Sequence, residues 1–347
     1  MLSRRHPISA RCGHQENKTR LVGGSVAQSA PWTNHSKAAL TRQYKKGNNS
    51  YSLVLGGGAH CARAASMGCW VSSERAMSNV TSHYGSGGIV ERILSAVPDA
   101  RAGSLAAEQL YPFDQLHGRE LIATQDHAAR LAPSASDRVL DIGSGIGGPA
   151  RFLAETYGCS VDGVDLTPAF VEASRRLTEF CGLSDKVRFH EADATRLPFA
   201  DDTFDAAICF YVGMNIADKA AVIGQAWRVL KPKARLVWTE AVLADGEPHY
   251  PLPWAVSAVA SHLVDRETLK ALFASAGFRV DDVIDETGDH VELALKRANS
   301  GIVPSPAQQQ ANEIVLGAEF VHRRKNYISS LSEGKLASLA VIVSKPA

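Results

Sequence analysis

The residues from Asp141 to Gly148, D-I-G-S-G-I-G-G, join a carboxylate to a glycine-rich stretch. Glycines let the backbone turn tightly and approach a ligand, and a helix that starts directly after them offers unpaired N–H groups. Asp165 follows seventeen residues after Gly148, where its carboxylate is placed to accept hydrogen bonds from a ribose diol. Together these features predict a site for a nucleoside-containing cofactor.

The glycines alone leave the kind of nucleoside open. Gly143, Gly145 and Gly148 also satisfy G-x-G-x-x-G, the dinucleotide pattern, so a NAD-dependent oxidoreductase is one alternative. Asp141 separates the two cases, because a carboxylate two residues before the first glycine repels a pyrophosphate but holds the α-ammonium group of a methionine moiety. We therefore favour a nucleoside that carries methionine.

Strand and helix patterns alternate around this loop. Short apolar runs predict strands, and apolar residues at helical spacing predict helices between them. The alternation predicts an α/β fold with a doubly wound, mostly parallel seven-stranded sheet and helices on both faces. The expected strands are 138–143, 160–165, 187–192, 204–211, 235–242, 278–284 and 336–343, and the expected helices are 147–157, 168–181, 218–230 and one that begins after Asp265.

A set of short motifs runs from about Tyr111 to the C-terminus: D-I-G-S-G-I-G-G, V-D-L-T, E-A-D-A, L-P-F, F-D and R-V-L-K-P. In this order and spacing the chain resembles class I S-adenosylmethionine-dependent methyltransferases, which have a Rossmann-like fold. Two departures are Ser144, where many relatives have Cys, and Lys233-Ala234, which replaces the usual Gly-Gly before the fifth strand.

Three further stretches, D-Q-L-H at Asp114–His117, G-I-G-G-P-A-R and M-N-I-A-D-K at Met214–Lys219, look like the sarcosine/dimethylglycine N-methyltransferase group. Quinone, tocopherol and sterol C-methyltransferases share some of them. The resemblance implies S-adenosyl-L-methionine as cofactor and a small-molecule methyl acceptor. The expected cofactor-binding residues are Asp141, Gly143, Ser144, Gly145, Asp165, Leu166, Asp193, Ala194 and Tyr211, with Asp193 beside the adenine, and the expected catalytic residues are His117, Tyr211 and Asn215.

Residues after the fourth and fifth strands are expected to face the transferred methyl group, and residues before the first strand to close the site against water. His117 is either a base for an acidic nucleophile or a hydrogen-bonding lid residue. The first group comprises Tyr211, Met214, Asn215 and Glu240, with Glu240 alternatively a partner of a loop amide, and the second comprises Tyr111, Gln115 and His117.

Four other side chains have two readings each. Trp254 and His262 are candidate substrate-wall residues or simple packing residues. Arg119 and Arg266 are candidate partners of a substrate carboxylate or solvated helix positions.

Several functions remain open. The first expectation is methyl transfer to the amine of a sarcosine/dimethylglycine-like substrate. A C- or O-methyltransferase of a quinone, sterol or polyketide-like ring is the alternative, and a large apolar pocket would favour it. Less favoured are a NAD-dependent oxidoreductase and a non-catalytic protein that binds S-adenosylmethionine.

Charge is distributed unevenly along the 347 residues. Residues 1–73 hold ten of the 37 basic residues and one of the 36 acidic residues, so the remainder carries 27 basic and 35 acidic residues and has no general attraction for nucleic acid or anionic membranes. The sequence contains no apolar run of about 18 residues, the length that a transmembrane helix needs. The six cysteines form no C-x-x-C pair and no His/Asp/Glu cluster has metal-ligand spacing. We expect no metal, no nucleic-acid or membrane partner, and a cytoplasmic location; a homodimer is compatible with the sequence.

Three regions are expected along the chain. Residues 1–76 lack sustained periodicity and are rich in Ser, Gly, Asn and Arg, so we expect a disordered tail or a non-native upstream extension with the working start at Met77; a targeting segment is a weaker reading. Residues 77–137 are expected to form N-terminal cap helices. Residues 138–347 are expected to form the methyltransferase domain, with a helical insertion at about 286–335.

Overall fold

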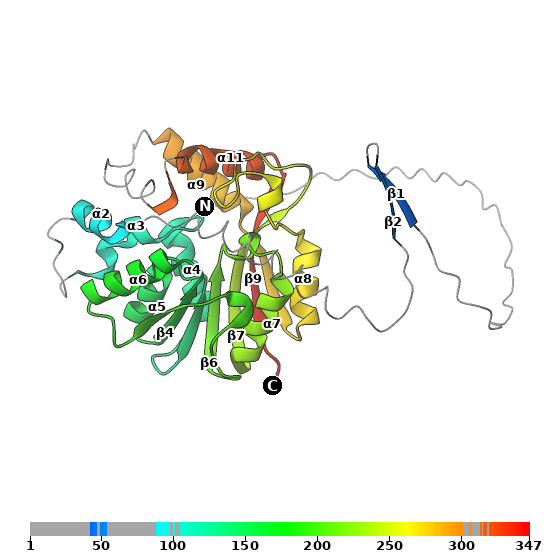
Figure 1. Ribbon diagram of the computed structural model, residues 1–347. Coiled ribbons are helices and arrows are strands. Elements are labelled where there is room, and N and C mark those ends of the chain that lie inside the picture. The colour runs from blue at the N-terminus through cyan, green and yellow to red at the C-terminus, as the bar shows by residue number, and fades with distance from the viewer. Residues whose placement is uncertain are drawn as a thin grey trace, which may run out of the picture. The chain divides into compact units, whose positions relative to one another are not determined.

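The computed structural model describes residues 42–46, 49–53, 88–97, 100, 105–300, 306, 313, 315–317 and 319–347 (Figure 1). The chain divides into two compact units, residues 1–65 and 66–347. In the first unit, β1 (Arg42–Lys46) pairs with β2 (Asn49–Leu53) in antiparallel fashion, with Tyr44 opposite Tyr51. This hairpin lies within residues 1–76, for which the sequence predicts a disordered tail or a non-native upstream extension. The sequence signal was Gly47-Asn48 between two five-residue runs, which favours a hairpin; the rest of residues 1–76 lies outside the described residues.

The second unit contains the predicted seven-stranded sheet. Its order is β5-β4-β3-β6-β7-β9-β8, and neighbouring strands are parallel except where β9 pairs with β7 and β8. The mostly parallel α/β fold predicted from the alternating pattern is confirmed. The strands are β3 (Arg138–Ile142), β4 (Ser160–Asp165), β5 (Val187–Glu191), β6 (Phe204–Phe210), β7 (Leu230–Leu243), β8 (Arg279–Asp285) and β9 (Leu336–Ser344).

Helices cover both faces of the sheet. Alternate residues of β3 show this, because Val139 packs in one apolar cluster with α4 and α5 whereas Leu140 packs in another with α7 and α8. Figure 1 shows α4, α5 and α6 on one side of the strands and α7 and α8 on the other. These helices are α4 (Glu120–Leu131), α5 (Gly148–Tyr157), α6 (Pro168–Phe180), α7 (Lys219–Val229) and α8 (Arg266–Ser275).

Helix boundaries follow local capping chemistry. The Asp265 carboxylate caps α8 by accepting from the Thr268 amide at 2.8 Å, and Asp218 caps α7 by accepting from the Ala221 amide at 2.9 Å. Pro168 stands in the first turn of α6, which ends just before Gly182 at φ 67°.

Lys233 replaces a glycine expected before the fifth strand, and the strand is longer than predicted. Lys233 takes φ 69°, a left-handed conformation that glycine adopts without cost. Its amide donates to the Lys345 carbonyl at 2.8 Å, and the Lys345 amide donates to the Ala234 carbonyl at 2.9 Å. Pairing with the chain after β9 therefore holds Lys233 in place, and β7 starts at Leu230.

Further helices lie above the carboxyl edge of the sheet (Figure 1). Before β3 come α2 (Ile89–Ala96) and α3 (Tyr111–Asp114), and between β8 and β9 come α9 (Thr287–Asn299) and α11 (Phe320–Ser332). Ion pairs tie α4 to these later helices: both oxygens of Glu120 accept from Arg297 at 2.8 Å. Within the described residues, no helix is both long and apolar enough to cross a membrane.

Candidate active site

A cavity of about 810 Å³ opens at the carboxyl edge of the sheet, where β3 lies between β4 and β6. This is the position where the strand order reverses, at which α/β sheets bind ligands. Every residue predicted to bind cofactor or to act in catalysis lines this one cavity: Asp141, Gly143, Ser144, Gly145, Asp165, Leu166, Asp193, Ala194, Tyr211, His117 and Asn215. The structure thus brings the predicted residues together.

The glycine loop lies at one end of the cavity. Gly143 has φ 74°, and a Cβ there would lie 2.2 Å from Val212 Cγ2, so only glycine fits. Asp165 anchors the loop by accepting from the Gly145 amide at 2.9 Å and from the Thr167 amide at 2.8 Å. A carboxylate has about four lone-pair positions, so Asp165 keeps acceptor capacity for a ribose diol.

Asp141 is buried and its Oδ2 has no hydrogen-bond partner. Burial and the neighbouring Asp165 charge raise the pKa of Asp141 to about 8. The Ser144 hydroxyl, also on the cavity wall, is buried without a partner as well. A buried carboxylate beside a second carboxylate needs a cation to offset its charge. Asp141 and Ser144 therefore fit the ammonium group of a methionine moiety.

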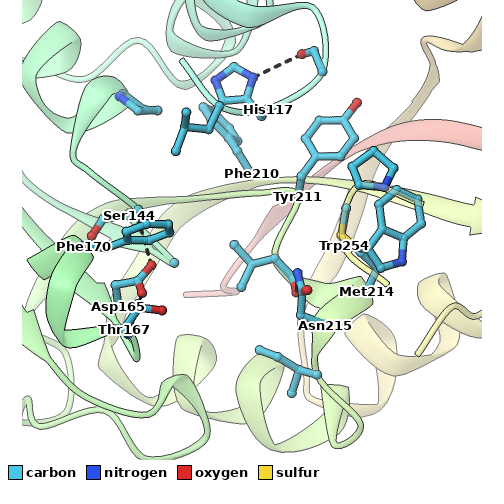
Figure 2. A pocket seen from close by; sticks show the side chains of 18 of the residues that line it. His117, Ser144, Asp165, Thr167, Phe170, Phe210, Tyr211, Met214, Asn215 and Trp254 are labelled. Atoms are coloured by element: carbon cyan, nitrogen blue, oxygen red, sulfur yellow. Dashed lines mark hydrogen bonds between the residues drawn. The ribbon is translucent and has the colours of Figure 1, made fainter. Parts of the chain in front are cut away.

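Asp193 lies on the same wall. Its carboxylate accepts from the Thr195 amide at 2.8 Å and so caps a short 3-10 helix, Ala194–Arg196. Its other acceptor positions leave room for an exocyclic amine. Figure 2 shows Ser144, Asp165, Thr167 and Phe170 gathered on one side of the pocket, the side predicted for the cofactor.

His117, Phe210 and Tyr211 lie above the middle of the pocket in the same view (Figure 2). His117 is stacked on Tyr211, with ring centroids 6.3 Å apart, and burial lowers its pKa to about 4. Its Nε2 lies 2.9 Å from Thr124 Oγ1, and its Nδ1 lies 3.1 Å from the Gly118 carbonyl oxygen. The imidazole is therefore neutral at pH 7.

Tyr211 is held in a strained backbone conformation, φ 56°. Its hydroxyl lies 2.6 Å from Ser338 Oγ and 2.8 Å from His290 Nε2. Burial raises the pKa of Tyr211 well above its usual range. These contacts fix the ring between the cofactor side and the far side of the cavity.

Glu240 does not face the cavity, which corrects the expectation that it faces the methyl group. It is fully buried, where its Oε1 lies 2.5 Å from Lys219 Nζ and its Oε2 accepts from Trp238 Nε1 at 2.8 Å. Lys219 Nζ also donates to the Gly213 carbonyl. The alternative reading, a partner for the loop, is closer to the finding: the buried pair supports the Gly213–Asn215 turn.

That turn carries Met214 and Asn215 into the cavity wall. Among the residues expected to close the site, Gln115 lines the cavity, but Tyr111 does not; its hydroxyl donates to Glu155 at 3.0 Å and its ring packs on Phe152. Tyr111 is therefore a packing residue of α3 rather than a lid residue.

Of the two candidate wall residues, Trp254 lines the cavity and His262 does not. Arg119 also lines it, yet its guanidinium is already matched by Asp126 at 2.5 Å and Glu286 at 3.0 Å. Arg266 pairs with Asp285 on the surface, outside the cavity. Neither arginine is available to a substrate carboxylate.

Sequence reasoning missed the wall formed by α9 and α11. Because these helices lie between β8 and β9 in the chain, no motif near the glycine loop points to them. The available signal was helical spacing on α11, where the cavity-facing residues recur at intervals of four, three and one. The missed residues are His290, Leu293, Phe320, Arg324, Tyr327 and Ile328.

Residues 139–233 match the family model described as "Methyltransferase domain". This segment spans the glycine loop, Asp141, Asp165 and Asp193, the residues whose geometry fits a methionine-bearing nucleoside. The chain contains a class I S-adenosylmethionine-dependent methyltransferase domain. The expected cofactor, S-adenosyl-L-methionine, is confirmed for this domain.

Relatives of this methyltransferase domain differ in their acceptors. An O-methyltransferase of Pyrenophora dematioidea is 32% identical over 45% of this chain and 59% of its own length. A glycine/sarcosine/dimethylglycine N-methyltransferase of Actinopolyspora halophila is 32% identical over 35% of this chain and 21% of its own. The chain therefore spans less than two thirds of the length of these curated relatives.

A solved structure shares the fold of the domain. Haemonchus contortus phosphoethanolamine N-methyltransferase 2, in complex with phosphomonomethylethanolamine and S-adenosylhomocysteine, superposes with a TM-score of 0.55 at 20% identity, covering 70% of this chain and 58% of that chain. The narrower likeness to sarcosine/dimethylglycine enzymes is one among several, and O-methyltransferases are equally prominent.

Proposed function

We propose that the protein transfers a methyl group from S-adenosyl-L-methionine to a hydroxyl oxygen of a small molecule with a large apolar body. The observation that carries the proposal is a large apolar wall beside a half-buried, neutral histidine. Met214 and Trp254 mark this side of the pocket in Figure 2. The apolar and aromatic residues of the wall are Phe210, Met214, Pro253, Trp254, Leu293, Phe320, Tyr327 and Ile328.

The composition of the wall supports an apolar acceptor. The cavity of about 810 Å³ includes the cofactor side, so the support comes from the apolar residues of the wall and not from the volume of the cavity. A sarcosine-like amine is small and polar and would leave most of the apolar wall uncovered. That amine remains the second candidate, because the motifs around His117 and Met214 resemble the sarcosine/dimethylglycine group and one relative carries that activity in its name.

The cofactor side holds and orients the methyl donor. When bound, S-adenosyl-L-methionine supplies a methyl group on a sulfonium centre. Asp141 would bind its ammonium group, Asp165 its ribose hydroxyls and Asp193 its adenine amine. Orientation matters most for an in-line displacement, since well-placed reactants gain about 7–11 kcal/mol over a bimolecular encounter.

His117 is suited to take the proton of a hydroxyl acceptor. Thr124 Oγ1 donates to Gln115 Oε1 at 2.6 Å, so its single proton is used and His117 Nε2 must donate to Thr124. Nδ1 then carries the lone pair and faces the Gly118 carbonyl, another acceptor. If Nδ1 takes the proton of a hydroxyl acceptor, it can donate that proton to the Gly118 carbonyl oxygen. The charged ring would then donate a hydrogen bond from each of its two nitrogens.

The helices above the sheet would keep water from the reacting atoms. We assign α2, α3 and α4 to an N-terminal cap, and α9 and α11 to a helical insertion at about 286–335 that completes the cover. Arg119 supports this assignment because it joins the two groups, bonding Asp126 of α4 and Glu286 just before α9.

The test is a product screen with isotopically labelled S-adenosyl-L-methionine over hydroxylated ring compounds, quinols, sterols and small amines. The proposal predicts O-methylated products from apolar ring compounds. Exclusive turnover of sarcosine or dimethylglycine would instead establish the second candidate, and cofactor binding without any product would contradict both.

A further inference from the structure

Helix α11 presents a single cation to the cavity. Its cavity-facing residues are Phe320, Arg324, Tyr327 and Ile328, spaced so that all fall on one side of the helix. Three of the four are apolar or aromatic. Arg324 is therefore a guanidinium set into an otherwise apolar part of the cavity wall.

The two arginines that line the cavity differ in how many carboxylates lie near their guanidinium groups. Arg119 has Asp126 at 2.5 Å, Glu286 at 3.0 Å and Asp289 at 3.7 Å. Arg324 has Glu120 at 3.4 Å as its ion-pair partner among the described residues.

Glu120 is itself occupied. Both of its carboxylate oxygens accept from the Arg297 guanidinium at 2.8 Å, a bidentate pair. The group of Arg297, Glu120 and Arg324 thus carries one net positive charge. Burial is the main cause that lowers the pKa of Arg324, and the neighbouring Arg297 lowers it further. A guanidinium has five N–H donors, so Arg324 has donors left for a ligand.

We propose that Arg324 binds a carboxylate of the methyl-acceptor substrate and so selects apolar acids over neutral compounds of the same shape. The inference rests on the proposed function and deepens it by naming a substrate class. One net positive charge matches a carboxylate better than a doubly charged phosphate ester.

The cofactor also limits the orientation of such a substrate. It would cover Asp141 and Asp165, which line the same cavity. The carboxylate would therefore lie at α11, with the apolar body along Trp254 and the acceptor hydroxyl near His117.

The experiment compares binding of 4-hydroxycinnamate, methyl 4-hydroxycinnamate and phenyl phosphate to protein saturated with S-adenosylhomocysteine, using calorimetry. The same series is repeated with two longer hydroxyaryl acids and their methyl esters. Because a hydrogen-bonded charge pair discriminates about 10–100-fold, the wild type is expected to bind at least one acid about tenfold or more tightly than its ester.

Arg324→Met should abolish that preference, and Arg324→Lys should retain part of it. Lys325→Met is the matched control, because Lys325 is the exposed neighbour on the same helix and does not line the cavity. Equal affinity for every acid and its ester, or a preference that survives in Arg324→Met, would overturn the proposal. Tighter binding of phenyl phosphate than of every acid would also overturn it. Failure of S-adenosylhomocysteine itself to bind would instead count against the proposed function.

Discussion

Asp165, the last residue of β4, accepts a hydrogen bond at 2.9 Å from the Gly145 amide in the loop after β3. One carboxylate therefore both shapes the glycine loop and faces the cavity. Replacing Asp165 with Ala should weaken S-adenosylhomocysteine binding by about 1–3 kcal/mol, because the ribose loses an acceptor. Calorimetry measures this loss, with Glu172→Ala on the exposed side of α6 as control. Equal affinity in the Asp165 and Glu172 variants would remove Asp165 from the cofactor site.

Asp141 is expected to destabilise the folded protein but to strengthen cofactor binding. Its pKa is raised to about 8 in the folded protein, whereas an unfolded Asp has a pKa of about 3.9. Between these values the folded state keeps a proton that the unfolded state releases, so this group lowers stability as pH rises from about 4 to 8. Asp141→Asn should raise the Tm of the cofactor-free protein at pH 8 by about 2–4 °C or more, for a gain of about 1 kcal/mol or more.

The same substitution should weaken S-adenosylmethionine binding, because the ammonium group loses its counter-charge. Thermal melts at pH 5 and pH 8 test the effect on stability. Calorimetry tests the effect on cofactor binding separately. A variant that melts lower than wild type at pH 8, or that binds the cofactor as well, would contradict the role given to Asp141.

The glycine loop, Asp141 and Asp165 were predictable because each depends on neighbours in the sequence and on a parallel register that places strand ends together. Glu240 was not, since the pattern of β7 does not tell which side of the strand faces the cavity and which faces the buried Lys219. Arg324 and His290 come from helices more than 120 residues after the glycine loop in the chain. Only the antiparallel insertion of β9 between β7 and β8 brings that region back over the site.

His117→Gln should lower the turnover of a hydroxyl acceptor about 10²–10⁴-fold while leaving S-adenosylhomocysteine affinity unchanged, as expected for loss of a general base. The pKa of His117, about 4, places the acidic limb of kcat/KM near pH 4 rather than near 6.5. The pH profile is measured alongside circular dichroism, so that unfolding is distinguished from titration. Full activity in the Gln variant would exclude His117 as the base.

Lys219 and Glu240 should act as one structural unit. Removing one partner of a buried ion pair costs about 3–5 kcal/mol, so Lys219→Met and Glu240→Leu should each destabilise strongly, and the double variant less than their sum. Urea denaturation of the wild type, the two single variants and the double variant measures their free energies of unfolding. The exposed pair Lys270–Glu267, at 2.9 Å, is the control and should contribute less than about 1 kcal/mol. A Lys219→Met effect no larger than that of Lys270→Met would contradict the buried pair.

Titration of the folded chain with S-adenosylhomocysteine in a calorimeter tests the central claim, that a methionine-bearing nucleoside occupies the cavity at Asp141 and Asp165. The account predicts saturable binding of one ligand per chain, weakened in Asp165→Ala, and no competition from NAD. Absence of binding, or displacement of the ligand by NAD, would contradict it.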